Sequence, residues 1–184
     1  MGGVRMVEVT ADSAEAIIAA MADEGGLVRP RLRRGCRCFA GLVEGRVVAY
    51  GWVSTGPEWI GELGLEFRPP AGEAYVWNCV TLPDHRLRGH FTALLLRVTQ
   101  IARAEGVRRL WIGSVDGGAE SAVVAAGYHP VLRFRVAELL GLRWLAVIEA
   151  DAADPDTVGV ALAAVGAGPG GPRARLSRAR QRTH

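Results

Sequence analysis

YVWNCVTLPDHRLRGHF, residues 75–91, is the stretch of sequence that decides the fold. Its first eight residues are largely β-branched and aromatic, which predicts a buried strand that ends before Pro83. After Gly89 the apolar residues recur at steps of three and four, as on one face of an amphipathic helix. Gly106 is expected to cap the end of that helix. The apolar face comprises Phe91, Leu94, Leu95, Val98, Ile101 and Ala102.

The turn between this strand and this helix has the chemistry of a phosphate site. A glycine turn that leads into a helix presents free backbone N–H groups and the positive end of the helix dipole to an anion. Arg86 and Arg88 add two permanent cations with forked donors. An ordinary solvated basic turn is the alternative, because a single glycine between a strand and a helix is a weak signal alone.

The turn resembles the phosphate loop of the GNAT N-acetyltransferase superfamily. That loop has the pattern Arg/Gln-x-x-Gly-x-Gly/Ala after a strand that ends near a proline. RLRGHF, residues 86–91, matches the pattern except at its last position, Phe91. The ring of Phe91 is expected to turn to the core as the first apolar residue of the helix, which leaves its backbone amide for phosphate.

The segments that follow extend the resemblance. A strand over 109–114 and a helix over 119–126, followed by Gly127-Tyr128, resemble the next part of the family. The detailed resemblance covers residues 75–128, and the order of the predicted strands extends it to most of residues 1–150. It implies an α/β (α+β) fold with a mixed, mostly antiparallel central sheet of about six to seven strands flanked by helices.

The remaining elements are predicted from periodicity and turn residues. In chain order they are a strand over 4–9, a helix from 14 to 21 or 22, a basic helical connector over 27–34, a hairpin of 36–43 with 46–54, and a hairpin of 131–140 with 143–150. The resemblance places the last hairpin at the edge of the sheet, beside the acceptor. It makes the connector one wall of the acceptor cleft, where its arginines face either an acidic acceptor or solvent.

Two segments are less regular. Residues 56–72 contain prolines, apolar residues and glutamates, and are expected to form a flap over the acceptor site, a dimer contact or a short extra strand packed on the core. Residues 151–184 form a Gly/Pro/Arg-rich tail outside the domain of residues 1–150, with one weak helical turn over 160–165. The tail is expected to be disordered, and its segment 157–184 carries five Arg and no acidic residue.

Composition limits the class of protein. With 184 residues and 49% hydrophobic residues, the chain fits a single globular domain. No run of about 18 apolar residues predicts a membrane span, and we expect a cytoplasmic protein. The three cysteines fit neither a disulfide framework nor a metal site, so Cys36 and Cys38 are interpreted as small buried residues on one strand face.

The resemblance also implies which residues bind coenzyme A. The backbone of Cys79, Val80 and Thr81 is expected to polarise the thioester carbonyl and to pair with the extended pantetheine arm. Phosphate contacts are expected from Arg86, Leu87, Arg88, Gly89, His90 and Phe91. Asp116 stands where the family usually has Asn, and Val123 stands where it often has the Tyr that protonates the thiolate.

Two glutamates and two tyrosines are candidate catalytic groups. Glu73, Tyr75, Trp77 and Cys79 are predicted to share one strand face by the period of two, and a glutamate on this strand removes the amine proton in related folds. Glu73 is therefore the first candidate for the base and Glu62 the second, although Glu73 could instead be a solvated turn residue. Tyr75, Tyr128 or water are candidates for protonating the departing thiolate, which can also leave unprotonated.

The sequence thus predicts an acetyl-coenzyme A-dependent N-acetyltransferase in which a primary amine attacks the thioester directly. A non-catalytic acyl-coenzyme A-binding module of the same fold is the alternative. The acceptor is expected to be a small-molecule or peptide amine, with a homodimer as one possible assembly. The arginines of the tail lack interleaved aromatic residues, so no specific nucleic-acid site is predicted. No membrane partner and no metal are expected either.

Overall fold

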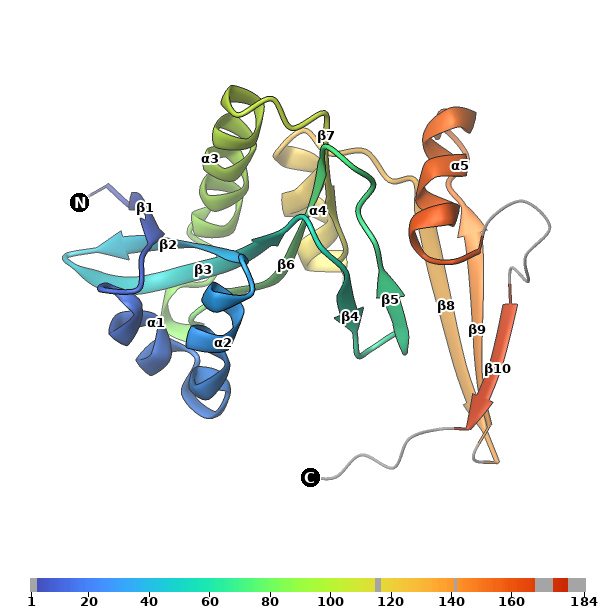
Figure 1. Cartoon of the computed structure of the whole chain (residues 1–184), viewed down its shortest axis with the longest axis horizontal. Coiled ribbons are helices and arrows are strands. Elements are labelled where there is room, and N and C mark those ends of the chain that lie inside the picture. The colour runs from blue at the N-terminus through green and yellow to red at the C-terminus, as the bar shows by residue number, and fades with distance from the viewer. Residues whose placement is uncertain (1–2, 115–116, 141, 168–173, 179–184) are drawn as a thin grey trace. The chain divides into compact units, whose positions relative to one another are not determined.

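The computed structural model describes residues 3–114, 117–140, 142–167 and 174–178, and its elements are labelled in Figure 1. The chain divides into two compact units. Unit 1 consists of Met1–Gly56 and Ala71–Tyr128, and unit 2 consists of Pro57–Pro70 and His129–His184. Of residues 1–150, which are predicted to form one domain, 57–70 and 129–150 belong to unit 2.

Unit 1 is built on a five-stranded sheet with the order β1-β2-β3-β6-β7. Neighbouring strands are antiparallel except for β6 and β7, which are parallel. This mixed, mostly antiparallel sheet confirms the predicted fold class. The strands are β1 (Arg5–Val9), β2 (Arg37–Val43), β3 (Arg46–Ser54), β6 (Glu73–Thr81) and β7 (Arg109–Ile112).

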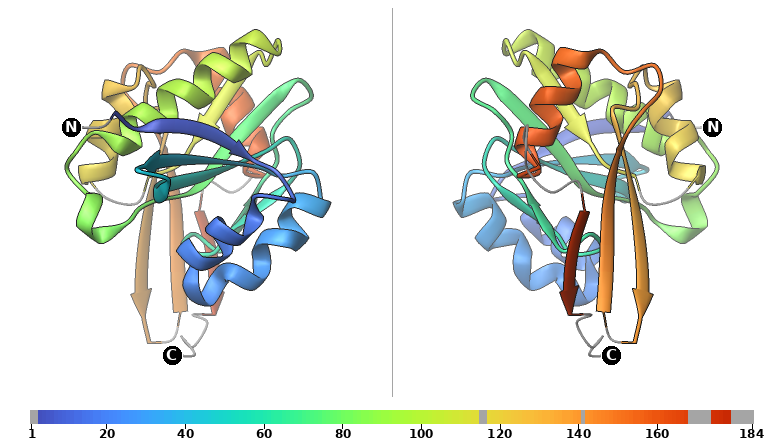
Figure 2. Two further views of the ribbon diagram at one scale, coloured as in Figure 1. Left: turned by 90° about the vertical axis from the view of Figure 1, so that its left-hand side faces the viewer. Right: turned by 90° about the vertical axis from the view of Figure 1, so that its right-hand side faces the viewer.

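Helices cover both faces of this sheet (Figures 1 and 2). One face carries α1 (Ala14–Ala20), the 3-10 helix η1 (Ala22–Leu27) and α2 (Val28–Arg33), whose apolar residues pack around Trp52 and Cys38. The other face carries α3 (His90–Ala104) and α4 (Gly117–Ala125). Leu94, Leu95 and Val98 of α3 pack there against Val76 and its neighbours in the sheet. We call these the α1–α2 face and the α3 face.

The helix after the phosphate turn forms as its periodicity predicts. Its buried residues are Leu94, Leu95, Val98 and Ala102. Gly106 caps its end in the left-handed region with φ +78°. The N–H of Gly106 donates to the Arg103 carbonyl and that of Val107 to the Ala102 carbonyl, which is the Schellman arrangement.

A β-bulge interrupts β6 at Asn78. The register with β3 shifts between Tyr50 and Trp52, so that Asn78 and Cys79 together lie opposite Gly51. Asn78 adopts φ +43°, a left-handed conformation that Asn tolerates better than most residues. A Cβ on Gly51 would lie 2.8 Å from Cys79 Sγ, so only glycine fits opposite the bulge.

The bulge corrects one prediction about β6. Trp77 packs on the α1–α2 face, whereas Cys79 packs on the α3 face. Cys79 therefore does not share a face with Glu73, Tyr75 and Trp77, because the extra residue reverses the alternation of side chains. Cys36 and Cys38 are both buried on the α1–α2 face, as predicted.

Unit 2 contains a two-stranded and a three-stranded sheet. Residues 57–70 form a hairpin of β4 (Glu58–Ile60) and β5 (Leu65–Phe67). Arg143 donates to the Glu62 carbonyl in this hairpin, and the Arg68 N–H donates to the Ala164 carbonyl at 2.8 Å. The segment thus pairs with itself, and its predicted roles as a flap or a dimer contact remain predictions.

The second hairpin belongs to the three-stranded sheet of unit 2. β8 (Leu132–Leu139) and β9 (Leu142–Glu149) form a separate antiparallel sheet with β10 (Ala174–Arg178), in the order β10-β9-β8. These strands pair with each other and with β10, and their predicted place beside the acceptor remains a prediction.

The predicted weak turn over 160–165 is part of a ten-residue helix, α5 (Pro155–Ala164). Asp154 caps it by accepting from the Thr157 N–H at 2.9 Å. Small residues let α5 bury Val158, Ala161 and Leu162. Residues 168–173 and 179–184 of the predicted tail lie outside the described residues.

Candidate active site

The strands β6 and β7 of unit 1 separate at the predicted thioester site. β6 pairs in parallel with β7 only from Glu73 to Val76, opposite Arg109 to Ile112, whereas β6 continues to Thr81. Residues 77–81 therefore pair with β3 on one side only. In the described part of the chain no strand covers their other edge, which leaves backbone groups open to an extended ligand.

Backbone alternation shows which of these residues face the open edge. The Leu82 N–H donates to the Val48 carbonyl of β3 at 2.9 Å. Because successive residues of an antiparallel strand alternate, Val80 also directs its N–H and C=O to β3, while Thr81 directs its own to the open edge. Arg86 Nε donates to the Thr81 carbonyl at 3.3 Å, consistent with that direction.

The phosphate turn has an unusual backbone. Leu87 and Gly89 are both left-handed, with φ +60° and +75°, and Arg86 before them is extended. Alternation of left- and right-handed residues points successive N–H groups into one concavity, the arrangement that binds anions. Leu87 is 106% exposed, so no burial compensates its left-handed strain of about 1–2 kcal/mol. Backbone strain of this kind is concentrated at functional sites, so it is consistent with the predicted phosphate contacts, which remain a prediction.

The start of α3 completes the turn. The Gly89 carbonyl accepts from the Ala93 N–H at 3.0 Å, so the N–H groups of residues 90–92 precede the first α-helical hydrogen bond and lack a partner within the helix. Phe91 packs against the α3-face core, as predicted. The departure of Phe91 from the family pattern therefore leaves the backbone of the turn accessible.

The two histidines beside the turn lie with their rings 6.2 Å apart. Burial lowers the pKa of His90, and His85 and Arg88 lower it further. The exposed Arg86 and Arg88 supply permanent positive charge to the turn.

The strand β6, the basic glycine turn and the helix α3 follow one another as the sequence predicted. The sequence profile of the Acetyltransferase (GNAT) family matches residues 10–123. The chain belongs to the GNAT acetyltransferase family. Members of this family use acetyl-coenzyme A, and one similar structure, an aminoglycoside N-acetyltransferase, was solved in complex with coenzyme A.

Solved structures agree with this GNAT fold. AAC(6')-Iy in complex with the bisubstrate analog CoA-S-monomethyl-acetylneamine has a TM-score of 0.59 at 12% identity, over 75% of this chain and 99% of that one. A probable acetyltransferase has a TM-score of 0.56 at 14% identity, over 73% and 96%. A ribosomal-protein-alanine N-acetyltransferase from Brucella melitensis biovar Abortus 2308 has 0.54 at 14%, over 74% and 98%. No curated protein sequence matches the chain.

Glu73, the first candidate for the GNAT base, is a buried ion-pair partner. Its Oε1 accepts from Arg109 Nη1 at 2.8 Å and its Oε2 from Trp111 Nε1 at 2.6 Å. It is 5% exposed, so its alternative interpretation as a solvated turn residue is wrong. Glu73 precedes Cys79 by six residues, a separation of about 20 Å along a strand. Its contacts support a structural role, and its role as base remains a prediction.

The two candidate tyrosines differ in surroundings. Tyr75 is buried, and its hydroxyl lies 3.4 Å from where a Cβ on Gly113 would be, just beyond the end of β7. The hydroxyl of Tyr128 lies 2.9 Å from that of Thr99, and burial raises the pKa of Tyr128. Only the Tyr75 hydroxyl therefore lies beside the point where β7 ends, whereas that of Tyr128 lies against the middle of α3.

The remaining predicted positions are less informative. Val123 packs against the same core cluster as Cys79, and Gly127 ends α4 with φ +90°. Asp116 lies outside the described residues, and Glu62 belongs to unit 2. In the ranges that the structure describes, no group of three or more His, Cys, Asp or Glu could hold a metal, and no helix is long and apolar enough to cross a bilayer.

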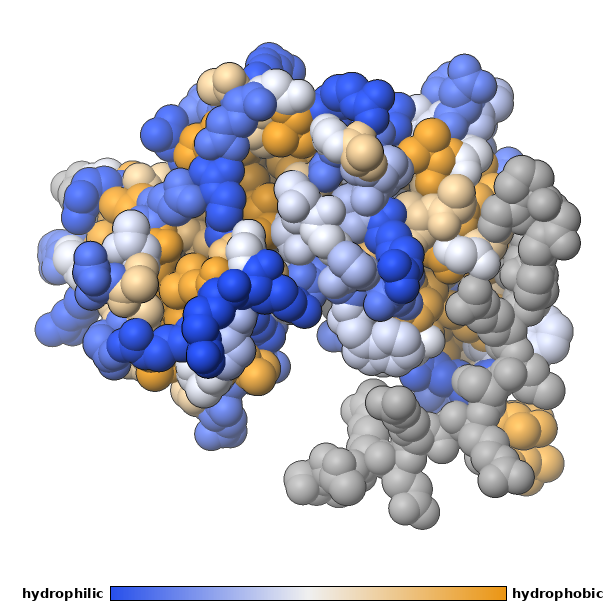
Figure 3. Space-filling view, in the orientation of Figure 1, coloured by the Kyte–Doolittle hydropathy of each residue, from blue (hydrophilic) through white to orange (hydrophobic). Residues whose placement is uncertain are grey.

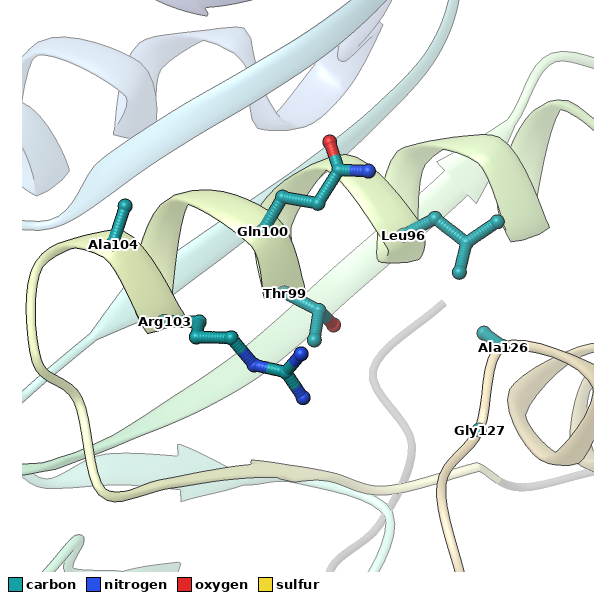
Figure 4. A pocket seen from close by; sticks show the side chains of 7 residues that line it. All are labelled: Leu96, Thr99, Gln100, Arg103, Ala104, Ala126 and Gly127. Atoms are coloured by element: carbon teal, nitrogen blue, oxygen red, sulfur yellow. The ribbon is translucent and has the colours of Figure 1, made fainter.

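A depression of unit 1 lies apart from these residues. It has a volume of about 530 Å³ and lies between the outer side of α3 and the end of α4 (Figure 4). Arg103 points from α3 toward the side of Gly127, and Gln100 also belongs to the lining. Its residues begin at Leu96, two turns beyond the phosphate turn, so it is separate from that turn.

The sequence did not reveal a polar contact at the bulge. Asn78 Nδ2 donates to Glu24 Oε2 of η1 at 3.0 Å. Beside it the Arg31 guanidinium lies 4.5 Å from the Trp77 ring and 5.2 Å from the Trp52 ring. Arg31 thus packs on the sheet instead of facing solvent or an acceptor. An Asn within a β-branched run was the one available signal, since Asn disfavours strands and tolerates left-handed backbone.

Proposed function

We propose that the chain is an acetyl-coenzyme A-dependent N-acetyltransferase that acts on primary amines by direct attack on the thioester. The open edge of β6 next to the strained 86–91 turn is the observation that carries the proposal. The GNAT family assignment supports the acetyl donor.

In this proposal the turn holds the diphosphate of coenzyme A. The N–H groups of residues 88–91 point to it, and Arg86 and Arg88 donate charge-assisted hydrogen bonds. The pantetheine arm then lies along β6 as an added partial strand, in contact with Thr81. Backbone donors near the bulge polarise the thioester carbonyl, and fixed donors of this kind act strongly because they need no reorganisation.

The amine nitrogen loses a proton and attacks the carbonyl carbon, so that a C–N bond forms as the C–S bond breaks. A thiolate with a pKa of about 8.5 leaves readily near neutral pH. Tyr75, whose hydroxyl borders the splay, is our first candidate for protonating it and Tyr128 the second. Glu73 holds β6 against β7, with a role as general base as the alternative.

A non-catalytic acyl-coenzyme A-binding module is the second candidate, because Val123 provides an apolar contact where the family often has an acid. Release of free thiol from acetyl-coenzyme A, measured with a panel of amines, tests the two. The panel includes an aminoglycoside and a peptide N-terminus. One similar structure is named an aminoglycoside acetyltransferase and another a ribosomal-protein-alanine N-acetyltransferase. Amine-dependent thiol release supports the enzyme. Coenzyme A binding without release from any amine supports the binding module.

A further inference from the structure

The carboxylate of Glu24, in η1, is held at the β6 bulge by a hydrogen bond from Asn78. Glu24 belongs to η1, between α1 and α2, and Asn78 belongs to the bulge, 54 residues later. The Asn78 amide donates to Glu24 Oε2 at 3.0 Å, and Arg31 Nη2 approaches the same oxygen at 3.4 Å. The left-handed backbone of Asn78 directs this contact to the α1–α2 face.

The other carboxylate oxygen of Glu24 is open. Both contacts fall on Oε2, and Oε1 has no hydrogen bond to the described residues. The Glu24 side chain is 55% exposed, so a ligand can reach Oε1. A carboxylate has about four lone-pair directions and can accept from a second cation while Arg31 and Asn78 keep their contacts.

The neighbouring arginine does not compete for the open oxygen. Arg31 is only 11% exposed in its side chain, and its guanidinium is held over the rings of Trp52 and Trp77. Its packing fixes α2 and Glu24 relative to the sheet. Strongly hydrophilic residues lie on the surface near α2 (Figure 3).

We propose that Glu24 binds a positively charged group of the acceptor beside the thioester, and that the acceptors are amines with a second cationic group. The inference rests on the proposed function, which places the thioester along β6 next to Asn78. The reacting nitrogen must be neutral to attack, whereas a charged carboxylate is best matched to a group that stays charged. Glu24 therefore binds the ammonium that does not react.

Matched amines test this inference. α,ω-Diamines with chains of three to six carbons are each compared with the monoamine of the same length, in the wild-type protein and in Glu24→Gln. We expect the wild-type protein to prefer at least one diamine, and Glu24→Gln to reduce kcat/KM for it about tenfold, the effect of losing one charged hydrogen bond. The monoamines and the KM for acetyl-coenzyme A should not change. For each amine, the kcat/KM of Glu24→Gln is divided by that of the wild type, so the intrinsic reactivity of the amine cancels.

Two further variants control for structural effects. Glu15→Gln removes another exposed carboxylate of the same wall, paired with Arg29, and should leave the diamine preference unchanged. Asn78→Gly keeps a residue that accepts the left-handed backbone but frees Glu24, and should weaken the preference. Equal loss for mono- and diamines in Glu24→Gln, or no diamine preference in the wild type, overturns the inference and leaves the enzyme assignment intact. Absence of thiol release with every amine overturns the proposed function instead.

Discussion

Glu73 Oε2 accepts a hydrogen bond from Trp111 Nε1 at 2.6 Å, across the only parallel strand pair among the described strands. Arg109 occupies the other oxygen and lies 5.3 Å from the Trp111 ring. This buried cluster ties β6 to β7 just before the two strands separate. Its loss is therefore expected to affect stability more than chemistry.

Replacing Glu73 tests this role. Glu73→Ala removes the carboxylate that accepts from Trp111 Nε1 and Arg109 Nη1, and should lower the free energy of unfolding by about 3 kcal/mol. This is the lower end for a broken buried pair, because Arg109 can reach solvent. Glu73→Gln keeps an acceptor and should cost about 1–2 kcal/mol. Urea denaturation measures both. Glu15→Ala, at an exposed ion pair, should cost less than about 1 kcal/mol.

The same variants test Glu73 as the general base. A base should lose at least about tenfold in turnover in Glu73→Gln near pH 7, and less at pH 9, where more amine is already neutral. If Glu73 has only a structural role, turnover per folded molecule in Glu73→Gln should equal that of the wild type at pH 7 and again at pH 9. Wild-type stability in Glu73→Ala together with a large loss of turnover would contradict the structural role.

Local periodicity predicted those parts of the fold that depend on neighbouring residues. The α3 face and the Gly106 cap follow from spacings of three and four residues and from one glycine. The helix α5 was underestimated, because Gly159 and several alanines give a weak pattern although Val158 and Leu162 are buried. Small residues pack closely without a strong amphipathic signal.

Contacts between distant residues were not predictable. The partners of Glu73 depend on the register of β6 with β7, and the Glu24–Asn78 contact joins η1 to a bulge. A bulge adds one residue and reverses every later side chain, which the alternation of the sequence alone does not show. The direction of the Cys79 side chain was therefore mispredicted. The composition of the turn at Arg86 and Gly89 was sufficient to predict where the turn ends and α3 begins.

The phosphate turn makes a prediction about binding. Arg86→Ala with Arg88→Ala should weaken coenzyme A binding at least tenfold at moderate salt, since each charged hydrogen bond contributes about 1.5–3 kcal/mol. Isothermal titration calorimetry measures the affinity. Arg97→Ala, at an exposed position further along α3, should bind as the wild type does. Unchanged affinity in the double variant would remove the turn from the site.

Backbone strain at the turn predicts that Leu87→Gly raises the stability of the fold and that Gly89→Ala lowers it. Leu87→Gly loses no burial and relieves a left-handed residue, so the melting temperature should rise by a few degrees, equivalent to about 1 kcal/mol. Gly89→Ala meets no atom within 4 Å but is strained at φ +75°, and should lower stability by about 1 kcal/mol. Differential scanning calorimetry measures both changes. A fall in stability for Leu87→Gly would show that the leucine side chain contributes a contact.

Cys38 gives a prediction about pH. Burial raises the pKa of its thiol to about 12, with a further increase from Cys79 and a decrease from Arg31. The unfolded thiol has a pKa of about 8.5, so above that pH the unfolded chain releases a proton that the folded chain keeps. The stabilising effect of the neutral thiol is complete below about pH 8.5 and is lost as the pH rises toward 12, by up to about 1.4 kcal/mol per unit. Urea unfolding at pH 8, 9 and 10 should therefore show a steeper decline in the wild type than in Cys38→Ala. Equal slopes in the two proteins would mean that the Cys38 thiol ionises as readily in the folded chain as in the unfolded one.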